Sequence, residues 1–240
     1  MTNLKELVIR GTLAEEVRIS SELISTGIKL IQEEHYYNEA IDVPLILLAN
    51  GLERLLKCIF CFYTLENTGK LPTMTAIKKD FNHNIAKLFE YVFSHCYSDD
   101  FIGKGTTQKD LYFFRTNPVF QGLVKVINDF ALRDRYANLD LILYEDLPKS
   151  SNPDDAWGKW IELVLMQEYP EMQQLSITDN KEFRRRSSRY IAASLNRLMY
   201  SFVHLMILGK IGEYANTSAG PLKKFRSYNP VHSEKEWFCK

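Results

Sequence analysis

The sequence predicts an all-α protein, built as a single helical-bundle domain of about six helices. Over most of the 240 residues, apolar positions recur every three to four residues, which is the period of a helix with one buried face. Long alternating runs rich in Val, Ile and Thr, which are typical of strands, are missing. With 45% hydrophobic and 25% charged residues, the composition is that of a folded globular protein and excludes a disordered or collagen-like chain.

The N-terminal part is predicted to hold three helices. The first covers about residues 12–38, where apolar residues recur at helical intervals. The second covers about 43–66, with Asp42 as its expected N-cap and Pro44 in the first turn, where the missing proline N–H costs least. The third covers about 82–97 and carries its apolar residues on one side.

Three further helices are predicted, at about 118–144, 153–169 and 181–215. Pro118 should break the chain and restart it as the first of these. Asp179 or Asn180 can cap the last one, because a short polar side chain accepts from exposed N–H groups at a helix start. We therefore expect one domain over residues 1–221 and an irregular C-terminal tail over 222–240.

The charge balance gives the whole molecule no long-range attraction to nucleic acid or anionic lipid. Thirty Lys and Arg residues match thirty Asp and Glu residues, so any such attraction must be local. The first residues are charged and lack the apolar core of a secretion signal, which favours a cytoplasmic protein. Charged residues interrupt the most apolar windows, about 44–63 and 190–211, so we expect buried helices and no membrane partner.

A polar strip runs along the last predicted helix. Arg197 and His204 are seven positions apart, so their directions differ by only about 20° at 100° per residue. Four more polar side chains are expected on or near this strip: Arg186, Arg189, Asn196 and Tyr200. An unpaired buried polar group costs roughly 1–3 kcal/mol, so such side chains must find partners or lie beside water. The strip is therefore the first candidate for a functional site.

Polar residues also interrupt two other apolar helices. Glu53 and Lys57 lie four positions apart on the second predicted helix, where they can form an internal ion pair worth a few tenths of a kcal/mol. Arg135 and Asn138 lie beside the apolar face of the fourth, where they can bridge to a neighbouring helix. Cys58 and Cys61 have ligand-like spacing, but no second cysteine pair accompanies them, so we expect no metal site.

Cations gather at the start of the last predicted helix. They are Lys181, Arg184, Arg185, Arg186 and Arg189. Positive charge at a helix N-terminus opposes the helix dipole, at about 0.3–1 kcal/mol each, so a balancing partner is expected. Two partners remain open, namely the phosphates of RNA and the acidic side chains of Glu145, Asp146, Asp154 and Asp155.

The order of motifs in the N-terminal half resembles a known family. Glu53 and Lys57 are followed, after a turn, by the run Asn82-His83-Asn84 and then Ile-Ala-Lys-Leu. This order resembles the HEPN-like helical superfamily, many of whose members carry an acid and a lysine on the second helix. In those members the next helix begins with a Gly-His-Asp-Leu-like run. The resemblance covers about 12–97 most clearly and the rest of the chain loosely.

The resemblance implies a function as well as a fold. Active members resemble metal-independent ribonucleases, often in toxin or phage-defence systems, and use an Arg followed after four to six residues by a His. Arg197 and His204 match with six residues between them. His204 would then move a proton at an RNA 2′-hydroxyl or leaving oxygen, and Arg197 would stabilise the phosphorane. The expected partners are RNA, a second copy of the chain, and an antitoxin or defence-system protein, with no cofactor.

Two alternatives remain open. The run from residue 133 to Asn138 is similar to an Arg-containing motif in which Asn138 stands where the His would be, and a chain built that way has lost its catalytic base. The second alternative is a non-catalytic HEPN-like binding or regulatory module, in which the polar strips only hold the core or a partner interface together, or a helical scaffold. Enclosure of Arg197 and His204 by apolar neighbours would favour that alternative.

Overall fold

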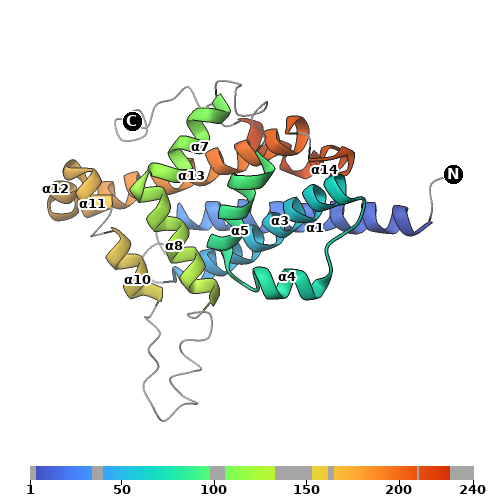
Figure 1. Cartoon of the computed structure of the whole chain (residues 1–240). Coiled ribbons are helices and arrows are strands. Elements are labelled where there is room, and N and C mark those ends of the chain that lie inside the picture. Colours follow the sequence, from blue (N-terminus) through green and yellow to red (C-terminus); the bar gives the residue numbers. More distant parts are fainter. Residues whose placement is uncertain are drawn as a thin grey trace, which may run out of the picture.

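The structure is a computed structural model that describes residues 4–33, 40–97, 106–132, 153–161, 165–209 and 211–227. Within these ranges the chain forms helices and turns and no strand, which confirms the all-α prediction (Figure 1). The elements in chain order are α1 (Leu4–Ile31), α3 (Asp42–Thr68), α4 (Met74–Asp80), α5 (Ile85–Tyr91), the π-helix η1 (Val92–Cys96), α7 (Thr106–Thr116), α8 (Pro118–Leu132), α10 (Pro153–Trp160), α11 (Met166–Glu168), α12 (Pro170–Thr178), α13 (Asn180–Leu208), α14 (Glu213–Ser218) and the 3₁₀-helix η4 (Gly220–Ser227).

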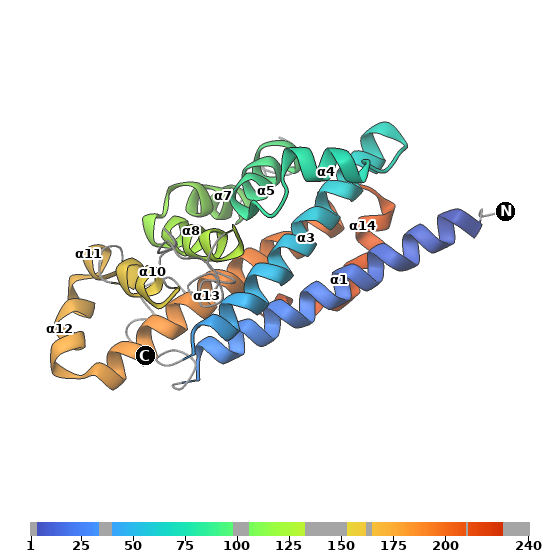
Figure 2. The ribbon, with the colours of Figure 1, turned by 90° about the horizontal axis from the view of Figure 1, so that it is seen from below.

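Helices α1 and α3 lie side by side along much of their length (Figure 2). Two glycines allow this close approach. A Cβ atom at Gly51 would lie 2.6 Å from Cγ1 of Ile24, and one at Gly27 would lie 2.8 Å from Cγ of Leu48. Both facing side chains are fully buried, so they have little room to move aside. The pairing of the two helices therefore depends on the missing side chains at these positions.

Helix α13 is the central packing element of the C-terminal part. It packs against α1, α7, α12, α14 and η4. Within the described part of the chain, it alone is long and apolar enough to cross a membrane, and 67% of its most apolar window is buried inside the protein. Both apolar windows of the sequence, in α3 and α13, thus lie in helices whose apolar residues are largely buried, as predicted.

Side-chain caps start several of these helices. Asp179 accepts from the backbone N–H of Glu182 at 3.0 Å and begins α13, as the sequence predicted. Asn117 accepts from the N–H of Phe120 at 2.8 Å, which confirms the expected break and restart at Pro118. These caps satisfy N–H groups that have no partner within their own helix.

The chain contains more helices than the six predicted. Of the helix predicted at 153–169, the structure describes α10 and α11, and residues 162–164 between them lie outside the described residues. Pro170 then begins α12, because proline has no N–H to bond into the preceding turn. The helix predicted at 181–215 ends at Leu208, and α14 follows Gly212, whose φ of 105° favours glycine. These breaks explain the higher helix count among the described residues.

Other helix starts also differ from the predictions. The helix predicted at 82–97 begins as α5 at Ile85 and follows a separate helix, α4, that the sequence did not predict. Asp42 lies in the first turn of α3 instead of at its N-cap, because Ile41 occupies that position. The segment predicted at 118–144 forms α8 as far as Leu132, and its remainder lies outside the described residues.

Part of the segment predicted to be an irregular tail is helical. The tail predicted to be irregular over 222–240 instead begins with six residues of η4. Leu222 is 0% exposed and Phe225 is 5% exposed, so this turn of helix belongs to the core. The hydroxyl of Ser21 in α1 donates to the carbonyl of Pro221 at 2.9 Å, which joins η4 to α1. The rest of the tail lies beyond the part of the chain that the structure describes.

Candidate functional site

Arg197 projects from α13 onto α7. Its Nε donates to Oδ1 of Asp110 at 2.7 Å, and its guanidinium carbon lies 4.1 Å from the centre of the Phe113 ring. The Arg197 side chain is 18% exposed and that of Asp110 is 5% exposed. A buried carboxylate and an aromatic face therefore hold the guanidinium in one orientation, with part of it still open to solvent.

His204 lies two turns further along α13. Its ring is partly exposed, and the ring centre lies 4.1 Å from that of Tyr200. Burial raises the pKa of Asp110, and both the hydrogen bond from Arg197 and the charges of Arg197 and His204 partly offset this rise. The carboxylate of Asp110 therefore lies within electrostatic reach of both Arg197 and His204. The period of the helix predicted that Arg197 and His204 share one strip of α13, and the structure adds a buried carboxylate that interacts with both.

A buried hydroxyl pair lies near this acid. The hydroxyls of Tyr97 and Ser201 are 2.8 Å apart and connect the end of η1 to α13. Burial raises the pKa of Tyr97, to which the charge of Asp110 adds. Tyr97 is therefore a neutral hydrogen-bonding group close to Asp110.

The other residues predicted on the strip do not all join this group. Asn196 and Tyr200 are partly exposed on α13, and Tyr200 contacts His204. Arg186 instead donates to Glu182 at 2.7 Å, one helical turn before it. Arg189 lines a separate pocket at the start of α13. The structure therefore divides the predicted strip into two regions.

The second set of candidates does come together. Nζ of Lys57 donates to Oε1 of Glu53 at 2.6 Å, the internal pair expected from their spacing. Nδ1 of His83 lies 3.0 Å and 3.2 Å from the two carboxylate oxygens of Glu53. The Glu53 side chain is 11% exposed and that of His83 is 53% exposed. The nearly buried carboxylate of Glu53 thus contacts two more exposed side chains, Lys57 and His83.

The turn between α4 and α5 directs His83 toward α3. Asn82 has a φ of 47°, in the left-handed region that asparagine tolerates better than most residues. Asn84 caps α5 by accepting from the N–H of Lys87 at 2.8 Å, and Asn128 on α8 accepts from that of Ala86 at 3.0 Å. The left-handed backbone at Asn82 and the two hydrogen bonds at the start of α5 together place His83 next to α3.

Some candidates cannot be placed. Arg135 and Asn138 lie outside the described residues, so the alternative built on them stays a prediction.

Burial raises the pKa of the Cys61 thiol to about 11 and raises that of the Cys58 thiol further, so both thiols are protonated near neutral pH. Across the described ranges, no group of three or more His, Cys, Asp and Glu side chains could hold a metal ion.

Sequence reasoning missed Asp110. It lies 87 positions before Arg197, in α7, which falls outside the six predicted helices. One local signal was available, because Asp110 is followed by Leu111, Phe113 and Phe114 in a short run of buried apolar residues. An acid inside such a run requires a partner, but the run itself does not identify which one.

Comparisons with known proteins found no match: no family model fits the chain, and no curated protein and no solved structure is significantly similar to it. The HEPN-like resemblance therefore stays a prediction that depends on the residues described above.

Proposed function

We propose that this protein is a metal-independent endoribonuclease of the HEPN type, with Arg197 and His204 as its catalytic residues. One observation supports this proposal above the others. Arg197 and His204 are both partly exposed on one face of α13, and both act on the buried carboxylate of Asp110. A fixed guanidinium beside an imidazole is a suitable arrangement for phosphodiester chemistry.

The reaction follows from these two side chains. The 2′-oxygen of a ribose attacks the adjacent phosphorus and loses its proton to an imidazole. The bond from phosphorus to the 5′-oxygen then breaks, and that oxygen takes up a proton from an imidazolium. The products are a 2′,3′-cyclic phosphate end and a 5′-hydroxyl end. The guanidinium of Arg197 stabilises the extra negative charge of the phosphorane with parallel N–H donors.

A single His204 is in one protonation state at a time, whereas the reaction needs a base and an acid. Two copies of the chain related by a two-fold axis would bring two imidazoles to one phosphodiester. The proposal therefore includes a homodimer whose α13 helices meet near His204. A toxin or phage-defence role, controlled by an antitoxin or another partner protein, belongs to the same proposal.

Asp110 has a positioning role in this scheme. Its carboxylate touches Arg197 through Nε at 2.7 Å, and its side chain is almost fully buried. It does not reach the reacting phosphate in the scheme, but it fixes the guanidinium on α7, and its charge interacts with the imidazole of His204. Asp110→Asn should therefore change the pH profile of cleavage as well as its rate.

The test is RNA cleavage by the purified protein in excess EDTA. His204→Ala should slow cleavage by roughly 10²–10⁴-fold, since a general acid–base group contributes about that much. Arg197→Gln should slow it by roughly 10²–10³-fold. Two matched controls lie away from the site: His95→Ala removes an exposed imidazole on η1, and Arg18→Gln removes an exposed guanidinium on α1. Both controls should cleave at the wild-type rate.

Each of three results would refute the proposal. A wild-type protein that cleaves no RNA from a diverse pool in EDTA would remove it. Cleavage that is undiminished in either His204→Ala or Arg197→Gln would do the same. Product ends other than cyclic phosphate and 5′-hydroxyl would exclude the proposed chemistry even if cleavage occurs.

One observation favours a second candidate, a non-catalytic HEPN-like binding or regulatory module. Arg197 is largely buried, paired with Asp110 and stacked on Phe113, which is also what a purely structural arginine does. In that case Arg197→Gln should lower the free energy of unfolding, and the wild type should show no cleavage. Measuring unfolding and cleavage on the same variants separates the two candidates.

A further inference from the structure

A pocket of about 370 Å³ lies between the C-terminal end of α1 and the first turns of α13. Ile31 and Glu33 contribute to its wall from the α1 side. The α13 side is cationic and includes Lys181, Arg184, Arg185 and Arg189. This volume is at the lower end of the range for small-molecule pockets, which is roughly 300–1,000 Å³. The pocket is therefore large enough for a small ligand and too small for a folded partner.

The cationic side chains of the pocket come from the first turns of α13. At 100° per residue, Lys181, Arg184, Arg185 and Arg189 spread over an arc of about 140°, so they border the pocket from a broad part of the helix surface. Four cations line the pocket, against the single carboxylate of Glu33. A cavity lined mostly by one sign of charge concentrates ligands of the opposite sign. The pocket thus favours an anion with more than one negative charge.

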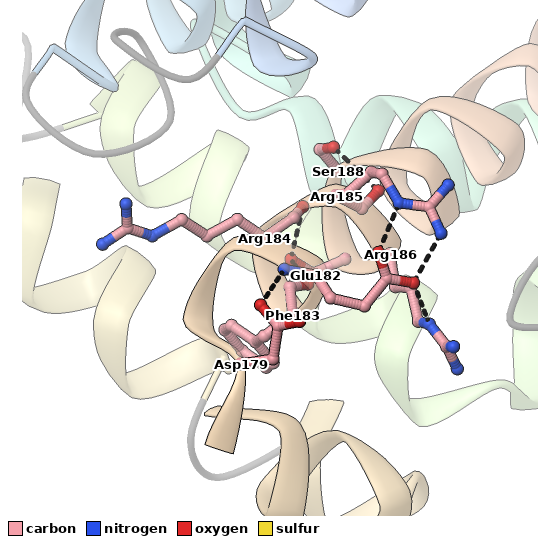
Figure 3. A network of polar contacts seen from close by, with 8 residues as sticks. Asp179, Glu182, Phe183, Arg184, Arg185, Arg186 and Ser188 are labelled. Atoms are coloured by element: carbon pink, nitrogen blue, oxygen red, sulfur yellow. Dashed lines mark hydrogen bonds and ion pairs between the residues drawn. The ribbon is translucent and has the colours of Figure 1, made fainter. Parts of the chain in front are cut away.

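The hydrogen-bond network around Glu182 holds part of this face in place (Figure 3). Both Arg185 and Arg186 donate to the carboxylate of Glu182, and their hydrogen bonds lower its pKa to about 2. Asp179 caps the helix start. In Figure 3 the Arg184 side chain extends to the opposite side of the helix from Arg185 and Arg186. Glu182 therefore fixes the guanidinium of Arg185, which lines the pocket.

We infer that this pocket binds a small molecule through a phosphate group with two or more negative charges. Guanidinium groups bind phosphate oxygens with paired N–H donors, and Arg184, Arg189 and Lys181 would supply them from adjacent turns.

This site is separate from the one proposed for RNA cleavage. Arg184 and Arg197 are thirteen positions apart on α13, so at 100° per residue they point about 140° apart. Of the two arginines that the sequence placed on the strip near the start of α13, Arg189 lines the pocket and Arg186 does not, and neither contacts Asp110. The two proposals can therefore succeed or fail independently, and the pocket can be tested without RNA.

The experiment is calorimetric titration of the purified full chain with inorganic pyrophosphate at constant ionic strength. The double substitution Arg184→Gln with Arg189→Gln should raise the Kd by about tenfold or more, because it removes two charge-assisted contacts. Glu33→Gln should lower the Kd by roughly threefold, because it removes a like charge from the pocket wall. The Kd should also rise with added NaCl.

The matched control is Arg18→Gln, which removes the same charge from an exposed position on α1 that does not line the pocket. It should bind pyrophosphate as the wild type does, and circular dichroism should confirm that all variants fold. Absence of pyrophosphate binding by the wild type would overturn the inference, as would equal weakening by Arg18→Gln. Binding of a short RNA that depends on Arg184 and Arg189, without pyrophosphate binding, would overturn the small-molecule assignment.

Discussion

The contact between α1 and α3 makes a sharp stability prediction at Gly51. Replacement by alanine would place a Cβ atom 2.6 Å from Cγ1 of Ile24 and 3.1 Å from its backbone nitrogen. The Cβ of Leu23 would lie 3.1 Å away as well. Ile24 is 0% exposed, and a backbone atom cannot rotate aside as the end of a flexible side chain can. Gly51→Ala must therefore push α1 and α3 apart.

The size of the effect comes from two opposing contributions. Alanine is favoured over glycine inside a helix by about 0.8–1.0 kcal/mol. Overpacking a filled interface costs about 1–3 kcal/mol, and the obstructing backbone puts Gly51→Ala in the upper half of that range. The expected net loss in the free energy of unfolding is about 1–2 kcal/mol.

Gly11 provides the matched control, because it lies in α1 and nothing lies within 4 Å of a Cβ built there. Gly11→Ala should therefore stabilise the protein by up to about 1 kcal/mol. Urea unfolding followed by circular dichroism measures both variants, and their free energies of unfolding should differ by about 1–3 kcal/mol. A Gly51→Ala protein at least as stable as the wild type would show that the two helices are not packed at this distance.

Three further predictions concern the candidate residues. Burial raises the pKa of Asp110 in the folded state, so folding disfavours its ionised form. The free energy of unfolding of the wild type, relative to that of Asp110→Asn, should therefore fall as pH rises above about 4. Urea titrations between about pH 4 and 7 measure this difference, and a constant value would contradict the reasoning. Burial raises the pKa of Cys61 to about 11, so at about pH 8 it should react with iodoacetamide far more slowly in the native protein than in denaturant. Mass spectrometry measures both rates, and equal rates would contradict the burial of this thiol. Glu53→Gln should destabilise the protein by about 1–3 kcal/mol and His83→Ala by less than about 1 kcal/mol, because only the glutamate is buried; thermal melts that reverse this order would refute it.

Two of the candidate groupings could be predicted from the sequence for different reasons. The period of an α-helix was enough to place Arg197 and His204 on one face of α13. The i,i+4 spacing was enough to pair Glu53 with Lys57. The addition of His83, which lies 30 positions after Glu53, was suggested only by the resemblance to a family. Its contact with Glu53 depends on the reversed turn at Asn82, which the sequence analysis did not predict.

By itself, the sequence determined the all-α class, the buried character of its two most apolar helices, and helix starts such as those at Asp179 and Pro118. These features depend on residues within a few turns of one another, so local spacing is sufficient to infer them. Only the tertiary structure decided that Asp110 is the partner of Arg197, and that the cations at the start of α13 face a pocket beside α1. The physical reason is that a polar group takes its partner from whichever helix packs against it, and the relative placement of helices depends on the packing of the whole core.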